Sequence, residues 1–366
     1  KAMPPSSALA CAAAAAARKA LGVLGQLRAR PARPASSMIT GKASGEAARS
    51  SPCRLLFLDP CRPNLVEELQ RGGCQVEKRG TDETVVEALL RTKPEVVVVR
   101  SSQVKEQQLA AAAAGCQDLR LVMRAGAGVD NLAVPALAES GVAVANAAGA
   151  NAVAVAELTM AHLLNLDRRV SDQVESLRRG EWRRLEFAKG PKGLFGRTLA
   201  VLGVGYIGRE VIRRAVAFGM SVRAWSRSLT EEDASKLGAR RCDTPEDAAD
   251  GADALAVHVA LSDATRGLVG ESLLSRLQPG ALLVNMSRGG VVDEAALLNA
   301  VEAQGLRAGL DVYSLEPAAG ETSFADEAIM ASRGVYGTHH TGARTEQAAE
   351  AVEGAVVEVV GAYLEG

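Results

Sequence analysis

The stretch AVLGVGYIGREVIRRAVAFG, residues 200–219, carries the pattern that most restricts how this chain can fold. Gly203, Gly205 and Gly208 follow an apolar run directly, and apolar side chains then recur on one helical face: Ile207, Val211, Ala215 and Phe218. In such a strand–turn–helix unit the first glycine permits a tight turn, the second lets a pyrophosphate approach, and the third lets the helix pack closely on the strand. The free N–H groups at the helix start favour phosphate. The pattern predicts a dinucleotide site, and the alternative is a structural glycine turn.

Short apolar runs alternate with helix-like segments through most of the chain. The predicted strands are 54–59, 95–100, 119–126, 142–147, 198–205, 220–226, 253–260, 281–287 and 307–313. Such runs are typical of parallel sheets that are covered by helices on both faces. Residues 152–182 contain no proline and predict one long helix that connects two α/β lobes. Residues 345–366 predict a last helix that packs back across the lobe boundary.

The charge balance restricts the partners of the chain. Its 366 residues suggest two domains, and 42 basic residues nearly balance 43 acidic ones. We therefore expect a small-molecule substrate and no nucleic acid. No apolar stretch is long enough for a membrane span, so no membrane partner is expected. The six cysteines show no metal-ligand spacing, and no metal site is predicted.

The first 50 residues differ in composition from the rest. They contain eight Lys and Arg residues and one acid, Glu46, in a background rich in Ala and Ser. This composition is typical of an organelle transit peptide, which would direct the protein to a plastid or a mitochondrion. The alternative is a disordered extension without a targeting role, and the protein would then be cytoplasmic.

The end of the strand at 220–226 bears on which dinucleotide binds. An acidic residue about 20 positions after the glycine turn normally binds the ribose hydroxyls of NAD. Here Ser226 stands at that place and Arg227 follows. This pair removes a negative charge that would repel a 2′-phosphate and adds a cation that could pair with it, so NADP is favoured over NAD. In the alternative, Ser226 bonds the ribose of NAD and Arg227 stacks on the adenine.

Two adjacent histidines occur in the segment GVYGTHHTGART, residues 334–345. A histidine can both give and take a proton near neutral pH, so His339 and His340 are candidates for an acid/base role. On local sequence alone, a solvated or backbone-bonded histidine is the simpler interpretation. Of the remaining histidines, His258 is expected to line the cofactor groove and His162 to pack in its helix or face solvent, without a chemical partner.

The chain resembles the D-isomer-specific 2-hydroxyacid dehydrogenases from about residue 54 to residue 366. The resemblance rests on seven motifs in family order: VVRSSQV (98–104), MRAGAGVDN (123–131), ANAVAVAEL (150–158), LGVGYIGRE (202–210), VNMSRGGVVDEAAL (284–297), AGLDVYSLEP (308–317) and HTGART (340–345). It implies an α/β fold in which a Rossmann-type NAD(P)-binding lobe, 151–341, is inserted in a flavodoxin-like, split substrate-binding lobe. The split lobe would comprise 51–150 and the C-terminal helix 342–366.

The resemblance also implies the catalytic residues Arg288, Glu316 and His340. Arg288 would bind the substrate carboxylate, because a guanidinium fork matches a carboxylate. His340 would exchange the hydroxyl proton and Glu316 would orient its ring. His339 stands where the family commonly has proline. Because neighbours on an extended segment point to opposite sides, we expect only His340 to face the substrate.

The family pattern further implies two groups of ligand-binding residues. The substrate group is Arg100, Arg124, Ala125, Gly126, Asn151 and Arg184. The cofactor group is Ala127, Gly203, Gly205, Tyr206, Ile207, Gly208, Ser226, Arg227, Val259, Met286, Ser287, Asp311 and Gly342. Arg184 would reach a neighbouring subunit, so a homodimer is expected, and Asp311 would hold the nicotinamide carboxamide.

These residues imply hydride transfer between NAD(P) and a D-2-hydroxy acid. The three arginines suit a phosphorylated acid, which points to the family members that act on 3-phosphoglycerate in serine biosynthesis. Ser226, His339 and Ala260 depart from the family pattern, and an NADP-dependent hydroxypyruvate or glyoxylate reductase remains the close alternative. A binding protein that senses the nucleotide without turnover is the alternative from another class.

Overall fold

The computed structural model of the chain describes residues 37–40, 51–112, 116–317 and 321–365. The transit peptide predicted over residues 1–50 therefore lies almost wholly outside the described residues. Within that segment, Ser37–Thr40 forms strand β1, which pairs antiparallel with residues 144–146. The assignment of residues 1–50 to a disordered transit peptide stays a prediction.

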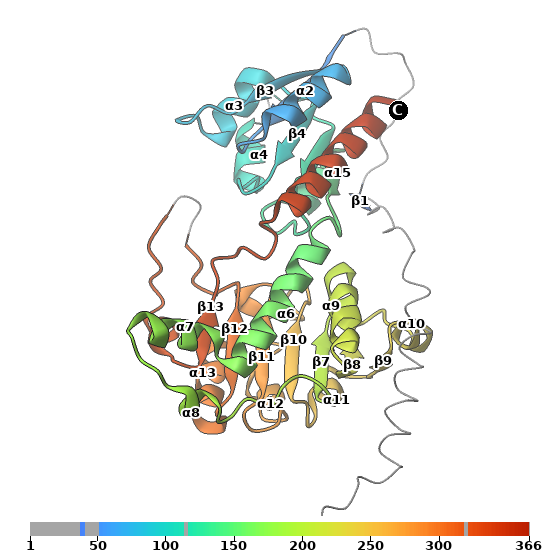
Figure 1. Cartoon of the computed structure of the whole chain (residues 1–366). Coiled ribbons are helices and arrows are strands. Elements are labelled where there is room, and N and C mark those ends of the chain that lie inside the picture. Colours follow the sequence, from blue (N-terminus) through green and yellow to red (C-terminus); the bar gives the residue numbers. More distant parts are fainter. Residues whose placement is uncertain (1–36, 41–50, 113–115, 318–320, 366) are drawn as a thin grey trace, which may run out of the picture. The chain divides into compact units, whose positions relative to one another are not determined.

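The nucleotide-binding unit is built on a sheet of seven parallel strands (Figure 1). Their order is β13-β12-β11-β10-β7-β8-β9. Counted from β7, the first six strands follow the order 3-2-1-4-5-6 of the Rossmann fold, with β13 added at one edge. The strands are β7 (Thr198–Leu202), β8 (Ser221–Trp225), β9 (Ala239–Arg241), β10 (Ala254–Val257), β11 (Leu282–Asn285), β12 (Arg307–Leu310) and β13 (Val335–Gly337).

Helices cover both faces of this sheet, as expected for buried parallel strands. One face packs on α6 (Ala152–Arg168) and α9 (Tyr206–Ala217), which lie side by side in front of the strands in Figure 1. The other face packs on α11 (Pro245–Ala249), α12 (Glu271–Leu274) and α13 (Glu294–Gln304). Two further helices each add a buried side chain to these cores: α10 (Glu231–Lys236) adds Ala234 to the first, and α14 (Glu327–Ala331) adds Ile329 to the second.

The other sheet has the order β1-β6-β5-β4-β2-β3. Its strands β2 to β6 are parallel, and counted from β2 they follow the flavodoxin order 2-1-3-4-5. The elements are β2 (Cys53–Phe57), α2 (Pro63–Arg71), β3 (Cys74–Lys78), α3 (Val85–Thr92), β4 (Val96–Val99), α4 (Glu106–Ala112), β5 (Leu121–Arg124), α5 (Val134–Glu139) and β6 (Ala143–Asn146). The predicted fold class, a Rossmann-type and a flavodoxin-like α/β unit, is confirmed.

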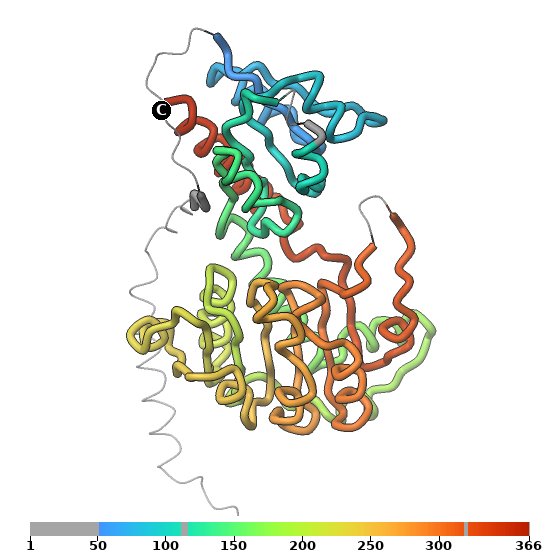
Figure 2. The backbone as a smooth tube through the Cα atoms, turned by 180° about the vertical axis from the view of Figure 1, so that it is seen from behind, coloured from blue at the N-terminus to red at the C-terminus, as the bar shows by residue number. Residues whose placement is uncertain are grey.

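The last helix, α15 (Glu346–Glu365), packs on the flavodoxin-like sheet although it is far away in the sequence. Its side chains Ala355, Val356, Val359 and Val360 belong to the same apolar core as residues of β2, β4 and β5. Figure 2 shows this helix in red beside the blue and cyan strands. The flavodoxin-like unit therefore draws its core from both ends of the described chain.

The single long helix predicted over 152–182 is wrong. The predicted range contains two helices, α6 and α7 (Val170–Arg178), and the short helix α8 (Arg184–Phe187) begins after it. Arg169 has φ 53° and ends α6 in the left-handed conformation. Its Nε donates to Asp172 Oδ2 at 2.8 Å, and Asn165 Oδ1 accepts from Ser171 N. Polar side chains therefore stabilise a turn that the absence of proline did not predict.

The apolar face of α9 also differs slightly from the prediction. Val211, Ile212 and Ala215 are fully buried, whereas Phe218 is 44% exposed at the end of the helix. Among the described residues, no helix combines the length and the apolar composition that a membrane crossing needs. The same residues contain no cluster of three or more His, Cys, Asp and Glu side chains placed to hold a metal.

Candidate functional site

The glycine turn lies after β7, where the order of strands in the sheet reverses. Gly203 has φ +94°, and a Cβ there would lie 2.6 Å from the carbonyl carbon of His258, which follows β10. A Cβ at Gly208 would lie 2.0 Å from the Gly203 carbonyl oxygen. Both positions therefore exclude any side chain. Gly205 caps α9, and nothing lies within 4 Å of its Cβ position, so the start of the helix has open space for a phosphate.

The residues after β8 carry no negative charge where the ribose would bind. Ser226 is partly buried, and Arg227 is exposed. Within the described part of the chain, no ion pair or side-chain hydrogen bond is recorded for Arg227. The Arg227 guanidinium is therefore available for a ligand anion.

Asp311 connects the end of β12 to the loop that carries the two histidines. Its carboxylate is 2% exposed and accepts three hydrogen bonds. These come from Thr338 Oγ1 at 2.6 Å, Thr341 N at 2.9 Å and Gly342 N at 2.8 Å. Hydrogen bonds to a charged carboxylate are strong. Asp311 therefore fixes the loop on both sides of His340.

His162, on α6, extends this network. Its Nε2 lies 3.1 Å from Thr338 Oγ1. The Thr338 hydroxyl gives its one proton to the Asp311 carboxylate, so it can only accept from the imidazole, and Nε2 must carry a proton. The ring is 4% exposed, and burial lowers the pKa of His162. The expectation that His162 has no chemical partner is therefore wrong.

Arg288 follows β11 and is held by a residue that the sequence reasoning missed. Its Nε and Nη2 donate to Asp130 Oδ1 at 3.2 and 2.7 Å, and its Nη1 donates to the Ser287 carbonyl at 2.8 Å. Burial raises the pKa of Asp130, but the hydrogen bond and charge of Arg288 outweigh burial and lower it overall. One N–H remains on each terminal nitrogen, which is the fork that a second carboxylate needs.

Asn285 fixes the turn on which Arg288 stands. Its Nδ2 donates to the Arg288 carbonyl at 3.0 Å, and its Oδ1 accepts from Ser287 N and Ser287 Oγ. Asn285 is 1% exposed at the end of β11. The sequence reasoning did not single it out, although it lies within the VNMSRGGVVDEAAL motif.

His340 and Glu316 form a hydrogen-bonded pair between His340 Nδ1 and Glu316 Oε1. The His340 Nε2 is left for proton exchange with a substrate. His340 has φ 51°, so the segment is not extended here and the argument from alternating side chains does not apply. The structure distinguishes the two histidines by their partners: both are exposed, but only His340 has a recorded side-chain partner among the described residues.

Arg100 lies where the strand order of the flavodoxin-like sheet reverses, between β2 and β4. Asp59 follows β2 and accepts from the backbone N–H groups of Arg100, Ser101 and Ser102 at 2.6, 3.0 and 3.0 Å. Burial and then the charge of Arg344 lower the pKa of Arg100. Arg344 therefore lies close enough to act on Arg100, and it is a further candidate cation that the sequence reasoning missed.

Arg124 folds over the chain that follows β5. Its Nη1 donates to the Ala125 carbonyl at 2.8 Å and its Nε to Asn131 Oδ1 at 3.2 Å. A Cβ at Gly126 would lie 2.0 Å from Nη1, so the guanidinium occupies the space that a side chain at position 126 would take. Burial is the main reason that the pKa of Arg124 falls to about 10.

Two other predicted substrate residues are placed differently. Asn151 begins α6, and its Oδ1 is buried without a hydrogen-bond partner. Such an acceptor favours a donor group from a ligand. Arg184 begins α8 and is exposed, and the structure records no contact between it and the other predicted substrate residues.

The other predicted cofactor residues surround the carboxyl ends of the strands. The Tyr206 ring is 2.7 Å from the Cβ position of Gly149, and Ile207 is partly buried behind it. Met286 Cε and Asp311 Oδ2 both lie 2.9 Å from the Cβ position of Gly342. The remaining three are Ala127, whose carbonyl accepts from Asn146 Nδ2, and the buried Val259 and Ser287.

His258 has an unusual environment at the end of β10. Both ring nitrogens are buried without a hydrogen-bond partner. Burial lowers the pKa of His258 to about 3. The ring is therefore neutral near pH 7, as a residue beside a cofactor groove can be, but it makes no polar contact with the described residues.

Comparisons with known proteins agree with this arrangement. Residues 160–353 match the family model described as D-isomer specific 2-hydroxyacid dehydrogenase, NAD binding domain. The chain is 35% identical over 315 residues to a D-3-phosphoglycerate dehydrogenase from Methanocaldococcus jannaschii. That match covers 86% of this chain and 58% of the relative, and the chain spans about half the length of the curated relatives that it matches.

Solved structures share the fold. A glyoxylate reductase from Paecilomyes thermophila has a TM-score of 0.75 and 25% identity, and the match covers 87% of this chain and 96% of that one. An NADPH-dependent glyoxylate/hydroxypyruvate reductase from Sinorhizobium meliloti, in complex with NADP and malonate, has a TM-score of 0.71 and 28% identity. That match covers 86% of this chain and 94% of the reductase.

Proposed function

The chain belongs to the D-isomer-specific 2-hydroxyacid dehydrogenases, and from this premise we propose that it transfers a hydride between NAD(P) and a D-2-hydroxy acid. The preferred substrate pair is 3-phosphoglycerate and 3-phosphohydroxypyruvate, which would place the protein in serine biosynthesis. The observation that carries the proposal is the common anchoring of the acid/base and cationic groups. His340 is paired with Glu316, its loop is bonded to Asp311, and Arg288 is held by Asn285 and Asp130.

Arg288 and His340 supply the two functions that this chemistry needs. The free N–H on each terminal nitrogen of Arg288 would bind the substrate carboxylate in two parallel hydrogen bonds. In the oxidation, His340 Nε2 would accept the proton of the C2 hydroxyl, and in the reduction it would return that proton. Glu316 would stabilise the protonated ring through Nδ1.

The residues after β7 and β8 fit a dinucleotide. The open space before α9 would take the pyrophosphate, and Arg227 would face the adenosine ribose. When bound, the nicotinamide supplies the acceptor or donor of the hydride. The orphaned Asn151 Oδ1 would accept a hydrogen bond from an amide or hydroxyl of the bound ligands. Because no carboxylate stands at position 226, we propose that NADP binds at least as well as NAD.

The cations around Arg100 support a phosphorylated substrate. The Arg100 backbone is fixed by Asp59, and the charge of Arg344 acts most strongly on its guanidinium, ahead of the opposing charges of Asp59 and Glu353. Like charges that lie near one another are stabilised by an anion between them. A phosphate on C3 of the substrate would supply two negative charges there, whereas glyoxylate would supply none.

Comparison of kcat/KM for phosphohydroxypyruvate, hydroxypyruvate and glyoxylate, with NADPH and with NADH, tests this proposal. A charge-assisted hydrogen bond is worth about 1.5–3 kcal/mol, so we expect the phosphorylated ketoacid to be preferred at least tenfold. The Arg100→Gln variant should lose this preference while its kcat/KM for glyoxylate stays within a few-fold. Equal values for the three substrates would contradict the phosphoglycerate assignment.

A reductase for hydroxypyruvate or glyoxylate is the second candidate. The Ser226-Arg227 pair favours it, because the fold neighbour from Sinorhizobium meliloti is named an NADPH-dependent reductase of these two acids. In that case kcat/KM for hydroxypyruvate with NADPH would exceed the value for the phosphorylated acid. A nucleotide-sensing protein without turnover is the third candidate, and it predicts NADPH binding with no reduction of any of the three acids.

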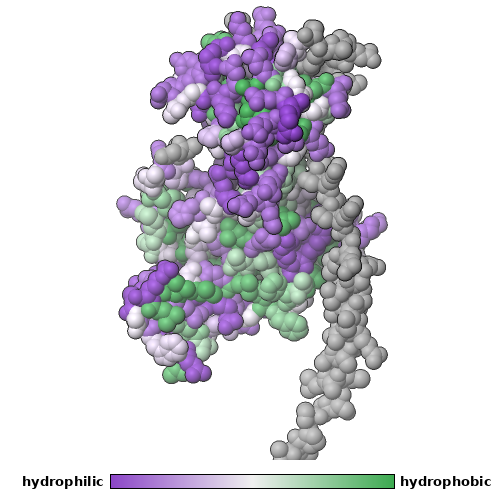
Figure 3. Space-filling model, turned by 45° about the horizontal axis from the view of Figure 1, so that its top comes forward, coloured by the Kyte–Doolittle hydropathy of each residue, from purple (hydrophilic) through white to green (hydrophobic). Residues whose placement is uncertain are grey.

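We propose that the protein is a homodimer that associates through α7, α8 and the loop after α8. Large apolar side chains are exposed along this segment: Val170, Val174, Leu177, Trp182, Leu185 and Phe195. Trp182 and Leu185 are each 80% exposed, which is uncommon in a monomer. Figure 3 also shows hydrophobic surface on this α/β unit. Arg184 lies between Trp182 and Leu185 and would enter the site of the second copy.

We also propose that residues 1–50 direct the protein to a plastid or a mitochondrion. Their excess of basic residues and near lack of acids support this. A fusion of this segment to a fluorescent protein, expressed in plant and animal cells, should concentrate in one of these organelles. A diffuse cytoplasmic signal would contradict the proposal.

A further inference from the structure

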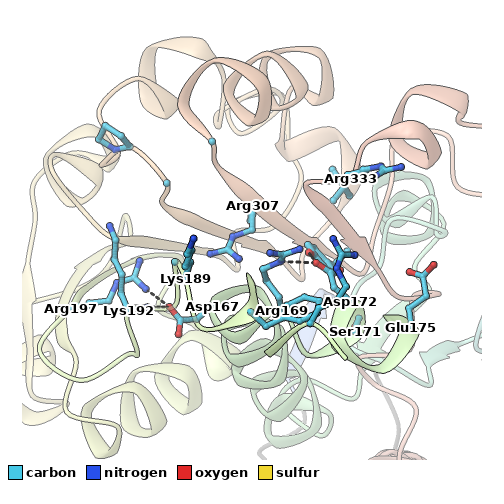
Figure 4. Close-up of a pocket in the computed structure, with 18 of the residues that line it drawn as sticks. Asp167, Arg169, Ser171, Asp172, Glu175, Lys189, Lys192, Arg197, Arg307 and Arg333 are labelled. Carbon is cyan, nitrogen blue, oxygen red and sulfur yellow. Dashed lines mark hydrogen bonds and ion pairs between the residues drawn. The ribbon is translucent and has the colours of Figure 1, made fainter. Parts of the chain in front are cut away.

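A large basic pocket lies at the opposite end of the Rossmann sheet from the glycine turn. It has a volume of about 1010 Å³ and is bordered by the start of β12 at Arg307, the end of α6 and the loop after α8. Figure 4 shows this pocket, which we call the Arg307 pocket. Strand β12 begins at Arg307 and leads to Asp311. The pocket and the candidate active site therefore lie at different ends of this strand.

The acidic side chains of the pocket already have hydrogen-bond or ion-pair partners. Asp167 accepts from Arg197 Nη1 at 3.0 Å and from the backbone N–H groups of Lys192 and Gly193. Asp172 accepts from Arg169 and from the Tyr336 hydroxyl, both at 2.8 Å, and Glu175 pairs with Arg179. Little acceptor capacity is left for the other cations of the pocket.

Four cations of the pocket have no ion pair or side-chain hydrogen bond recorded within the described residues: Lys189, Lys192, Arg307 and Arg333. Arg307 is half-buried, and burial is the main cause that lowers its pKa; Tyr336 and Asp167 oppose this effect, and the smaller influence of Arg169 and Arg197 adds to it. Figure 4 shows Arg307 between Lys189 and Arg169. A counter-ion would therefore relieve both desolvation and repulsion.

Arg197 adds an observation of a different kind. It is 8% exposed, and its Nε has no aligned hydrogen bond although Asp253 Oδ1 lies 3.4 Å away. A buried donor without an acceptor is uncommon and costs free energy unless a ligand or water satisfies it. The wall of the pocket therefore has both unpaired positive charge and an unsatisfied donor.

We propose that the Arg307 pocket binds a small anion that carries two or more phosphate groups. Its walls are mostly charged, with few apolar side chains, so an apolar ligand does not fit. The volume exceeds that of a single phosphate, and the free cations stand on several elements, so a compact ligand with several negative groups is needed to contact them together. Arginine and lysine both bind phosphate well, Arg through its planar fork and Lys as a point charge.

The pocket is distinct from the sites of the proposed reaction. None of its lining residues belongs to the glycine turn, the Arg288 turn or the loop that carries His340. An acidic segment of a second copy is the competing occupant, because nine lining residues between Ser171 and Lys192, with Lys189 and Lys192 among them, belong to the segment that we propose to form the dimer interface. The experiment has to distinguish an anion from that occupant and from the active site.

The experiment measures binding of inorganic tripolyphosphate by isothermal titration calorimetry to the full chain saturated with NADPH, which occupies the pyrophosphate position. We expect saturable binding of one anion per chain. The Arg307→Gln/Lys192→Gln double variant should bind at least tenfold more weakly. The Arg71→Gln/Lys236→Gln variant, with the same change in net charge but outside the pocket and outside the proposed cofactor site, should bind as the parent does.

Two further measurements make the outcome decisive. The Arg100→Gln variant should keep parental affinity, and loss of binding there with retention in the pocket variant would place the anion in the active site and overturn the proposal. Light scattering should give the same molecular mass for the pocket variant and the parent. A change to monomer in the pocket variant, or no saturable binding by the parent, would also overturn it.

Discussion

At the scale of single residues, the two histidines differ in their partners rather than in their chemistry. His340 is bonded to Glu316, and the loop around it is fixed by the buried Asp311 carboxylate. His339 has neither connection. The neighbour of His339, His340, has a positive φ, so the chain turns there. The directions of the two side chains then depend on contacts far away in the sequence, and the pattern of the sequence alone could not distinguish them.

Replacing His340 with alanine should lower kcat by about 10²–10⁴-fold, the usual contribution of a positioned acid/base. His339→Ala is the matched control and should stay within a few-fold of the parent, because no carboxylate partner orients this side chain in the described part of the chain. Steady-state reduction of the preferred ketoacid measures both variants. An inactive His339 variant beside an active His340 variant would contradict the assignment.

Replacing Ser226 with aspartate should shift cofactor preference toward NAD. A carboxylate about 4 Å from a 2′-phosphate repels it by about 1–4 kcal/mol, depending on the local dielectric, which corresponds to a tenfold or greater loss of NADPH affinity. Fluorescence titration with NADPH and NADH measures the change, and affinity for NADH should not fall. If the parent already prefers NADH strongly, the interpretation of Ser226-Arg227 is wrong.

At the scale of elements, the sequence predicted the interior of both sheets and missed their edges. The nine apolar runs correspond to the nine central strands, whereas β1, β3, β9 and β13 are the outermost strands of the two sheets. An edge strand such as β9, with the sequence ARR, is solvated on one side and needs no continuous apolar run. β9 is a strand because it pairs with β8, and not because of its own sequence.

The candidate site follows the same rule. The cofactor turn was predictable, because the chemistry and the spacing of its glycines are local. Asp130, Asp59 and Arg344 were missed although they lie near recognised motifs, because what marks them is a contact across elements. His162 was misjudged for the same reason, since its partner Thr338 is 176 residues away in the sequence.

Helix α6 should affect catalysis through His162. His162→Leu leaves the buried Thr338 hydroxyl without its donor, which should cost about 1–3 kcal/mol of the free energy of unfolding and lower kcat as the loop around His340 loosens. His162→Gln offers an N–H at a similar reach and should recover most of both losses. Urea unfolding and kcat measure the pair. Identical behaviour of the two variants would show that packing alone, and not the hydrogen bond, matters.

His258, which follows β10, should make the free energy of unfolding decrease in acid. Burial lowers the pKa of His258 to about 3, whereas an unfolded histidine has a pKa of about 6.5. Between these values the unfolded chain binds a proton that the folded chain does not, so this contribution to stability is complete above pH 6.5 and is lost as the pH falls. The slope is about 1.4 kcal/mol per pH unit per group.

Urea unfolding of His258→Phe between pH 7 and pH 5 tests this contribution. The variant should lose less stability over this range than the parent does. His339→Phe, which replaces an exposed histidine, is the control and should follow the parent. Equal pH dependence of the His258 variant and the parent would contradict a neutral, buried ring.

At the scale of the whole molecule, the exposed apolar segment from α7 to the loop after α8 should be buried against a second copy of the chain. Leu185→Glu places a charge in the proposed dimer interface and should convert the dimer to a monomer at micromolar concentration. Met330→Glu is the control, because Met330 is 56% exposed on α14, outside this segment. Light scattering after gel filtration measures the mass. A parent protein that is already monomeric would contradict the proposal.

Arg288 also has a consequence for the whole catalytic cycle. A free arginine side chain loses about 2 kcal/mol of rotamer entropy when a ligand immobilises it. Here Asp130 and the Ser287 carbonyl already restrict that freedom, and the connection joins a residue after β11 to one after β5. The ordering of the guanidinium therefore occurs when the chain folds. The arriving carboxylate meets a fork with little entropy left to lose, and its binding energy can go into holding the reacting carbon in place.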